Sequence, residues 1–152
     1  MDYNRLFEED CVYQLQSKDI EELKSFLKKK KGWVYIASSK NNHLLKIGRT
    51  SKNPWERAKS LSSTGVLHDY QIDFALPVFN QFFVEKEIHK KLKKFRISKE
   101  FFSLKNDIAI EAMESVYRKE KELLSRFFNI EMVHDDIELL SYAIKNFSLP
   151  KS

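Results

Sequence analysis

The sequence predicts a mixed fold of the α/β (α+β) class, in which a β-hairpin, a helix, a third strand and a second helix follow in that order. Two patterns predict it. Two aliphatic and aromatic runs flank a polar turn in residues 33–49, and a third alternating run begins near residue 70. Apolar residues recur at helical spacing after the hairpin and again after the third run. At 152 residues the chain has the length of one domain with helical additions.

The hairpin has its strands in Trp33–Ala37 and Leu44–Arg49, with a polar Asn-Asn turn between them. Because side chains alternate along a strand, Tyr35 and Lys46 should point from the same face. A tyrosine and a lysine on one open face could hold a polar ligand. Alternatively, Tyr35 is a half-buried strand tyrosine and Lys46 is solvated, as is common for these residue types. The opposite face should meet the core through Val34, Ile36, Leu45 and Ile47.

A helix should precede the hairpin. Ser17 is a suitable N-cap, and Asp19 in the first turn is favoured by the helix dipole. The lysines of Lys28–Lys31 suit the C-terminal end of this helix, and Gly32 should end it. Helical spacing defines its apolar side, which contains Ile20, Leu23, Phe26 and Leu27.

The helix after the hairpin should run from about Pro54 to Ser62. Asn53 is a good N-cap, and proline suits the first helical position. Arg57 lies on or beside the inward face of this helix. An arginine there is either a surface or ion-pair residue or a phosphate ligand, because its planar fork matches phosphate oxygens. The third strand, Tyr70–Phe79, should end at its proline or soon after.

The helix Gln81–Phe95 carries two stripes of side chains. Glu85 and His89 share one stripe with Arg96, beside the edge of the core. A lone acidic residue among many lysines is a candidate metal ligand or catalytic acid. The alternative is an ordinary ion pair from Glu85 to His89 or to a lysine. The other stripe belongs to the core and contains Val84, Ile88, Leu92 and Phe95.

Two further helices are expected toward the C-terminus. The first should run from about residue 106 to 128, and the last from about residue 134 to the proline at 150. They should pack together and against the domain, or against a second subunit in a homodimer. Phe101 and Phe102, which precede them, should close the core.

Composition sets further limits. A net charge of +5 and a pI near 9.2 suggest a polyanionic partner. The single cysteine, Cys11, permits no internal disulfide and no cysteine-based zinc site, which fits a reducing, cytoplasmic setting. No stretch approaches the roughly 20 apolar residues of a membrane span, and the acidic start has no apolar signal core. No membrane partner is therefore expected.

Five short motifs occur in order on these elements. They are Gly-Trp-Val-Tyr-Ile from residue 32, Lys-Ile-Gly-Arg-Thr from 46, Glu-Arg-Ala-Lys-Ser-Leu from 56, Glu-Lys-Glu-Ile-His from 85 and Glu-Phe-Phe from 100. With these motifs the chain resembles the GIY-YIG endonuclease superfamily. It is most similar to the phage and bacterial branch in which the second motif reads Lys-Ile-Gly. The resemblance covers roughly Lys31–Leu104.

The resemblance implies a small, mostly antiparallel three-stranded sheet flanked by helices, and a DNA endonuclease that uses one divalent metal ion. It divides the chain into an N-terminal helical extension (1–30), a nuclease domain (31–104) and a C-terminal helical extension (105–152).

The resemblance also implies roles for catalytic residues. Tyr35 would deprotonate or position the attacking water, Arg57 would stabilise the scissile phosphate, and Glu85 would bind Mg²⁺ or Mn²⁺. One carboxylate, phosphate oxygens and waters suit such a hard cation. Two positions depart from the pattern, since Trp33 stands where the first motif has glycine and Lys46 replaces the tyrosine of the second motif. A lysine is a poor base at neutral pH but a good phosphate ligand, so Lys46 is a fourth candidate.

Two main interpretations remain open, and a third, weaker one is an interaction protein whose terminal helices form the working surface. The first is a metal-dependent DNA endonuclease, which the presence of Tyr35, Arg57 and Glu85 favours. The second is a nucleic-acid-binding or regulatory module that does not cut, which Lys46 favours. Double-stranded DNA is the favoured partner in both, with single-stranded DNA or RNA as alternatives. Contacts with the phosphate backbone are expected from Arg49, Lys52, Lys86, His89, Lys90, Lys93 and Arg96.

Overall fold

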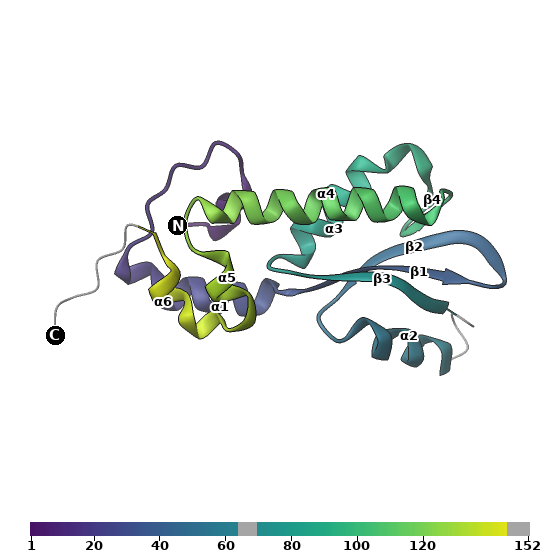
Figure 1. Cartoon of the computed structure of the whole chain (residues 1–152), viewed down its shortest axis with the longest axis horizontal. Coiled ribbons are helices and arrows are strands. Elements are labelled where there is room, and N and C mark those ends of the chain that lie inside the picture. The colour runs from purple at the N-terminus through teal and green to yellow at the C-terminus, as the bar shows by residue number, and fades with distance from the viewer. Residues whose placement is uncertain (64–69, 146–152) are drawn as a thin grey trace. The chain divides into compact units, whose positions relative to one another are not determined.

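The computed structural model describes residues 1–63 and 70–145, without the side chains of residues 60–63 and 135 (Figure 1). The chain divides into two compact units, Lys31–Tyr117 and Met1–Lys30 together with Arg118–Ser152. The predicted domain division at residues 30/31 and 104/105 stays a prediction, because compactness alone does not show that a segment folds by itself.

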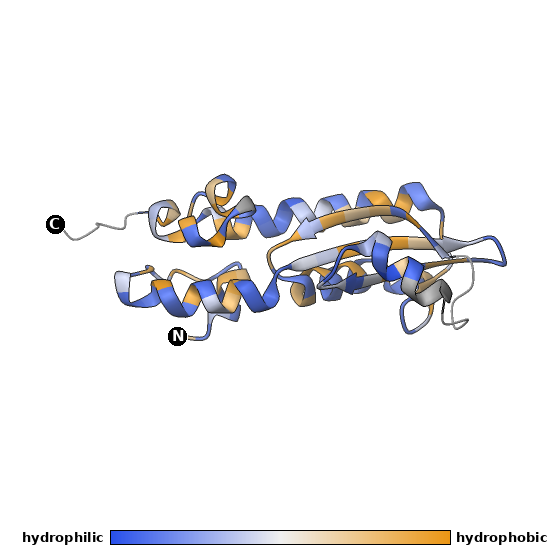
Figure 2. Cartoon of the chain, turned by 90° about the horizontal axis from the view of Figure 1, so that it is seen from below, coloured by the Kyte–Doolittle hydropathy of each residue, from blue (hydrophilic) through white to orange (hydrophobic). Residues whose placement is uncertain are grey.

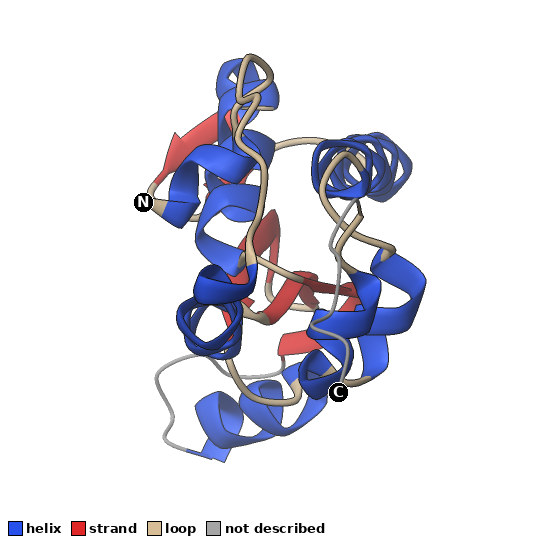
Figure 3. Cartoon of the chain, turned by 90° about the vertical axis from the view of Figure 1, so that its left-hand side faces the viewer, coloured by secondary structure: helices blue, strands red, loops and turns tan. Residues whose placement is uncertain are grey.

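A five-stranded sheet forms the centre of the unit Lys31–Tyr117 (Figure 3, strands in red). Its strand order is β3-β1-β2-β5-β4, and every neighbouring pair is antiparallel. The strands are β1 (Gly32–Ser39), β2 (Asn42–Thr50), β3 (Tyr70–Val78), β4 (Arg96–Ser98) and β5 (Phe101–Phe102). The prediction of three strands is wrong. Strands β4 and β5 contain only three and two residues, which is too short for an alternating pattern to reveal them.

The predicted hairpin is confirmed as β1 and β2. In its register Tyr35 pairs with Gly48, and Ala37 pairs with Lys46. The four aliphatic residues assigned to the core face are all buried in one hydrophobic cluster, namely Val34, Ile36, Leu45 and Ile47. Alternation along the strands therefore sorted the two faces correctly.

The prediction that Phe101 and Phe102 both close the core is correct for only one of them. Phe102 is fully buried in the core cluster. Phe101 points the other way, because consecutive strand residues alternate, and its ring lies 6.4 Å from the ring of Tyr70.

Helices cover both faces of this sheet (Figure 1). Helix α2 (Pro54–Ser63) packs against β3 and β1, and α3 (Gln81–Lys91) packs against β2 and β1. Asn53 caps α2 as predicted, since its side-chain oxygen accepts a hydrogen bond from the backbone of Trp55 at 2.9 Å. Helix α3 is shorter than predicted, because a 3-10 turn, η3 (Lys93–Phe95), replaces its last turn.

Helix α4 (Asn106–Ser125) also contributes to the core of this unit through its first half. In Figure 2, hydrophobic residues recur along α4 between hydrophilic ones, as expected for a helix with one buried side. The buried residues are Ala109, Ala112, Met113 and Val116.

The other unit is built from short helical segments. They are η1 (Tyr3–Phe7), η2 (Ser17–Asp19), α1 (Ile20–Lys30), the end of α4, α5 (Ile130–Asp135), η4 (Ile137–Leu139) and α6 (Leu140–Ala143). The prediction of one last helix from about residue 134 to 150 is wrong. Asp136, near its expected start, has an extended backbone (φ −148°, ψ 104°), and α6 already ends at Ala143, because Ile144 is extended (φ −66°, ψ 126°). The predicted end at Pro150 lies outside the described residues. None of the described helices is long and apolar enough to cross a membrane.

Asp19 stabilises the start of α1 in a way that the helix-dipole argument did not predict. The N-cap is Gln16 rather than Ser17. The buried Asp19 carboxylate accepts hydrogen bonds from the Gln16 backbone at 2.8 Å and from the hydroxyl groups of Tyr13 at 3.0 Å and Tyr3 at 3.2 Å. These bonds connect the N-terminal segment with the helix.

Gln81 joins the start of α3 to the ends of β1 and β2. Its fully buried side chain donates hydrogen bonds to the Lys31 carbonyl at 3.1 Å and to Ser51 Oγ at 2.9 Å. Gly32 leaves room for this arrangement. A Cβ atom at Gly32 would lie 2.5 Å from Gln81 Nε2 and 2.7 Å from the Thr50 carbonyl oxygen, closer than packed atoms approach.

We expect Gly32→Ala to lower the free energy of unfolding by about 1–3 kcal/mol, because its methyl group would displace Gln81 and a backbone carbonyl. Urea denaturation followed by circular dichroism measures this change. Lys31→Ala, at the exposed neighbouring position, is the control and should stay within about 0.5 kcal/mol of the parent. Equal stability of the two variants would contradict this account of the junction.

Candidate functional site

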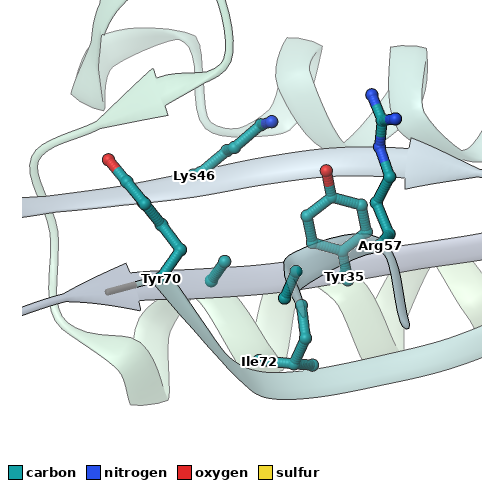
Figure 4. Close-up of a pocket in the computed structure, with 7 residues that line it drawn as sticks. Tyr35, Lys46, Arg57, Tyr70 and Ile72 are labelled. Atoms are coloured by element: carbon teal, nitrogen blue, oxygen red, sulfur yellow. The ribbon is translucent and has the colours of Figure 1, made fainter. Parts of the chain in front are cut away.

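Tyr35, Lys46 and Arg57 line one pocket between the sheet and α2 (Figure 4). Figure 4 shows the tyrosine hydroxyl, the lysine amine and the guanidinium group extending toward the same side. The predicted common face of Tyr35 and Lys46 is confirmed, since Lys46 Nζ lies 5.9 Å from the centre of the Tyr35 ring. The other lining residues are Ala37, Ala58, Tyr70 and Ile72.

Gly48 allows the Tyr35 ring to lie over β2. The two residues are partners in the β1–β2 register. A Cβ atom at position 48 would lie only 2.9 Å from the Tyr35 hydroxyl oxygen and 3.0 Å from the adjacent ring carbon. Any larger residue would therefore move the hydroxyl, so the glycine of the Lys-Ile-Gly motif determines where this hydroxyl lies.

Lys46 is not a solvated strand residue. Its side chain is 10% exposed, and Nζ lies 3.6 Å from a carboxylate oxygen of Glu100. Glu100 immediately precedes β5, and its carbonyl accepts a hydrogen bond from the Ile47 backbone at 2.9 Å. This partner of Lys46 was not predicted, and the Glu-Phe-Phe motif was the only signal for it in the sequence.

Arg57 presents a positive charge at the pocket. It is exposed and lies one turn into α2. Within the part of the chain that the structure describes, its guanidinium group has no hydrogen bond or ion pair. An unpaired arginine beside a tyrosine and a lysine favours an anion ligand over a structural ion pair.

Glu85 lies on α3, outside the residues that line this pocket. Its Oε1 atom is 3.6 Å from Arg49 Nε, so its ion-pair partner belongs to β2 and not to its own helix. Its Oε2 atom is buried and has no hydrogen-bond partner among the described residues. Burial raises the pKa of Glu85, and the nearby negative charge of Glu100 raises it further. The positive charges of His89, Arg49 and Lys46 oppose this rise, with His89 having the largest opposing effect. Its charge therefore interacts with that of the Lys46–Glu100 pair.

Three polar residues of α3, one turn apart, contact the end of β2. Gln81 Oε1 accepts a hydrogen bond from Arg49 at 3.4 Å. Glu85 pairs with the same arginine, and His89 Nε2 lies 2.8 Å from the Ile47 carbonyl oxygen. β5 pairs only with the middle of β2, which leaves this edge open to α3. The predicted common stripe is confirmed for Glu85 and His89 but is wrong for Arg96, because α3 ends at Lys91 and Arg96 begins β4. The contacts of Gln81 were not predicted.

The residues predicted to bind phosphates have different environments. Arg49 stacks on the ring of Phe82, with 4.0 Å between the guanidinium carbon and the ring centre. Arg96 donates a hydrogen bond to the Lys99 carbonyl at 2.5 Å. Four lysines are exposed, namely Lys52, Lys86, Lys90 and Lys93. The role of these residues in binding stays a prediction.

Glu85 is the residue that fits a divalent metal ion. Among the described residues, no group of three or more His, Cys, Asp or Glu side chains could hold such an ion. Magnesium usually binds through one or two carboxylates, with waters and phosphate oxygens completing its shell. The unpaired, buried Oε2 of Glu85 supplies one such ligand, so the donor set is compatible with this mode of binding.

A family model described as the T5orf172 domain matches residues 32–117. The match begins with β1 and includes every residue considered at the site, from Tyr35 to Glu100. No curated protein and no solved structure matches the chain.

We expect Glu85→Gln to reduce the pH dependence of stability. Because the pKa of Glu85 is raised by folding, the unfolded state releases its proton first as the pH rises. Glu85 should therefore contribute a loss of stability between the ordinary glutamate pKa and the raised one, and the variant lacks this contribution. Urea denaturation across weakly acidic pH measures the difference, with Glu87→Gln as the control on the same helix. Identical pH profiles for the parent and Glu85→Gln would contradict this account.

Mn²⁺ should raise the melting temperature of the parent but not of Glu85→Gln.

Proposed function

Because the chain belongs to the T5orf172 domain family, which is associated with nucleases, we propose that it is a metal-dependent DNA endonuclease of the GIY-YIG type. The observation that carries this proposal is the set of four side chains Tyr35, Lys46, Arg57 and Glu85, which come from β1, β2, α2 and α3. A tyrosine hydroxyl and two cationic groups share one pocket. The carboxylate of Glu85, which has a free buried oxygen, lies outside that pocket on α3, pairs with Arg49 of β2 and interacts electrostatically with Lys46. Groups of these kinds can catalyse the hydrolysis of a phosphodiester.

The cationic groups would act on the phosphate. Negative charge increases on the phosphate oxygens as the bond to the attacking oxygen forms, and pre-positioned cations stabilise it without reorganising. Arg57 can use its planar fork on two oxygens, because no described residue occupies it. Lys46 supplies a point charge, and its pairing with Glu100 holds the amine beside Tyr35.

Tyr35 would orient the attacking water. Its hydroxyl oxygen can accept a hydrogen bond from this water while its own O–H donates one to a neighbouring oxygen. The contact with Gly48 fixes the position of that hydroxyl, and a fixed hydrogen-bond acceptor holds the water in one orientation.

Glu85 would hold Mg²⁺ or Mn²⁺. When bound, such an ion neutralises phosphate charge and lowers the pKa of a coordinated water. The free Oε2 atom supports this role, because it has no hydrogen-bond partner among the described residues.

The second candidate function is a nucleic-acid-binding module that does not cut. It is favoured by one observation, the engagement of Lys46 with Glu100, which lowers the charge available to a phosphate. The two functions differ in the fate of the DNA, so an assay of cleavage distinguishes them.

We expect the protein to cleave DNA in Mg²⁺ or Mn²⁺ and Glu85→Gln to abolish cleavage while binding persists. The variant removes the charged metal ligand but keeps the size and the polar end of the side chain. Gel electrophoresis of plasmid and single-stranded DNA measures cleavage, and fluorescence anisotropy measures binding. Glu87→Gln is the matched control and should cut normally. If Glu85→Gln cuts as fast as the parent, Glu85 is not the metal ligand.

We expect Lys46→Met to slow cleavage roughly a hundredfold or more, because removing one pre-placed cation commonly costs a few kcal/mol of transition-state stabilisation. Methionine keeps most of the length of the side chain and removes only its charge. Lys40→Met, in the exposed hairpin turn, is the control for the change in net charge. Single-turnover rates measure the effect, and an unchanged rate would leave catalysis to Tyr35, Arg57 and Glu85.

A further inference from the structure

An exposed tryptophan, Trp55, packs on β1 next to the Tyr35 pocket, although it is not one of the residues that line it. Trp33 precedes Tyr35 by two positions on β1, so both point from the same face of the sheet. The Trp33 ring meets the Trp55 ring of α2 edge to face, with 6.0 Å between their centres. Trp55 remains 53% exposed, although side chains of this kind are highly buried on average.

A second aromatic pair lies near the far end of β1. Tyr70 lines the pocket (Figure 4), and its ring centre lies 6.4 Å from that of Phe101. Tyr70 pairs with Ser39 at the end of β1, whereas Trp33 lies near the start of the same strand. At about 3.3 Å per residue, the strand between these positions spans roughly 20 Å. The two aromatic pairs therefore flank the site along the direction of β1.

Positive charges lie between and beside these aromatic pairs. Lys46 and Arg57 line the pocket itself, and the exposed Lys52 precedes the cap of α2. Proteins that bind single strands combine these two features, because bases stack on aromatic rings while cations follow the phosphate backbone.

We propose that the DNA strand crossing this face is single-stranded, with unpaired bases stacked on Trp55 at one end and on Tyr70 at the other. A phosphate of the stretch between these two bases then lies at Tyr35, Lys46 and Arg57. This inference rests on the proposed function, because it specifies the substrate of the same site.

A duplex would make less use of this face. In an intact duplex each base is stacked between its neighbours, so its ring faces are not available to protein side chains. Phosphate contacts alone would hold a duplex and would leave the exposed ring of Trp55 without a ligand. Trp33, which stands where the first motif of the resembled superfamily has glycine, gains a role here because it supports the Trp55 ring.

Tryptophan fluorescence reports directly on this surface, because the chain contains two tryptophans and both belong to it. The full-length protein is titrated in EDTA, which prevents metal-dependent cleavage. The ligands are a mixed-sequence DNA oligonucleotide and the same strand annealed to its complement. We expect the single strand to quench the fluorescence and to bind about tenfold more tightly than the duplex, as one or two stacked bases would provide.

Variants at position 55 test the stacking itself. Trp55→Ala should weaken single-strand binding by about tenfold and leave duplex binding nearly unchanged. Trp55→Phe keeps an aromatic ring and should restore most of the affinity. Tyr142→Ala removes a residue that is 66% exposed on α6 and should change neither affinity. Melting temperatures establish that each variant is folded.

The outcomes separate this inference from the proposed function. Equal binding of the two DNA forms, or unchanged fluorescence at saturation, would overturn the single-strand inference and leave the nuclease proposal standing. A preference for the single strand without its cleavage in Mg²⁺ or Mn²⁺ would support the inference and overturn the proposal of catalysis. Failure to bind either form would overturn both.

Discussion

The pairing of β1 with β2 is the constraint on which the candidate site depends. Its register sets Tyr35 against Gly48 and Lys46 against Ala37, so the polar groups leave the sheet on one face. A slip of one residue would turn the side chains of one strand to the opposite face. The hydrophobic core prevents such a slip, because it would expose the aliphatic residues of the slipped strand. The same burial that stabilises the sheet therefore also positions Tyr35 and Lys46.

Two charged groups keep polar atoms without a partner among the described residues, as the proposed metal ion and phosphate would require. The buried Oε2 of Glu85 has no hydrogen-bond partner among the described residues, and such an oxygen is unfavourable unless something binds it. Contacts of Gln81 and His89 hold α3 to β2 without it. Arg57, one turn into α2, is likewise unpaired within the described chain. Proteins commonly accept lower stability at positions that are arranged for function.

Elements with long periodic patterns could be predicted from the sequence, whereas contacts between distant short segments could not. The hairpin, α2 and β3 follow from alternation and from the cap at Asn53. The common face of Tyr35 and Lys46 follows from the same alternation. The ion pair between Lys46 and Glu100 was not predictable, because it depends on a two-residue strand pairing with β2. The early end of the last helix also escaped prediction, since its apolar spacing continues through Ile144, where the backbone is already extended.

The central claim is that one phosphate and one divalent ion meet between Tyr35, Lys46, Arg57 and Glu85. Anomalous diffraction from crystals grown with Mn²⁺ and an uncleavable phosphorothioate oligonucleotide tests it most directly. The account predicts a manganese peak at coordination distance, about 2.1 Å, from a carboxylate oxygen of Glu85. It also predicts a backbone phosphate in contact with Arg57 and Lys46. A manganese peak away from Glu85, or a phosphate bound only by the exposed lysines of α3, would contradict the account.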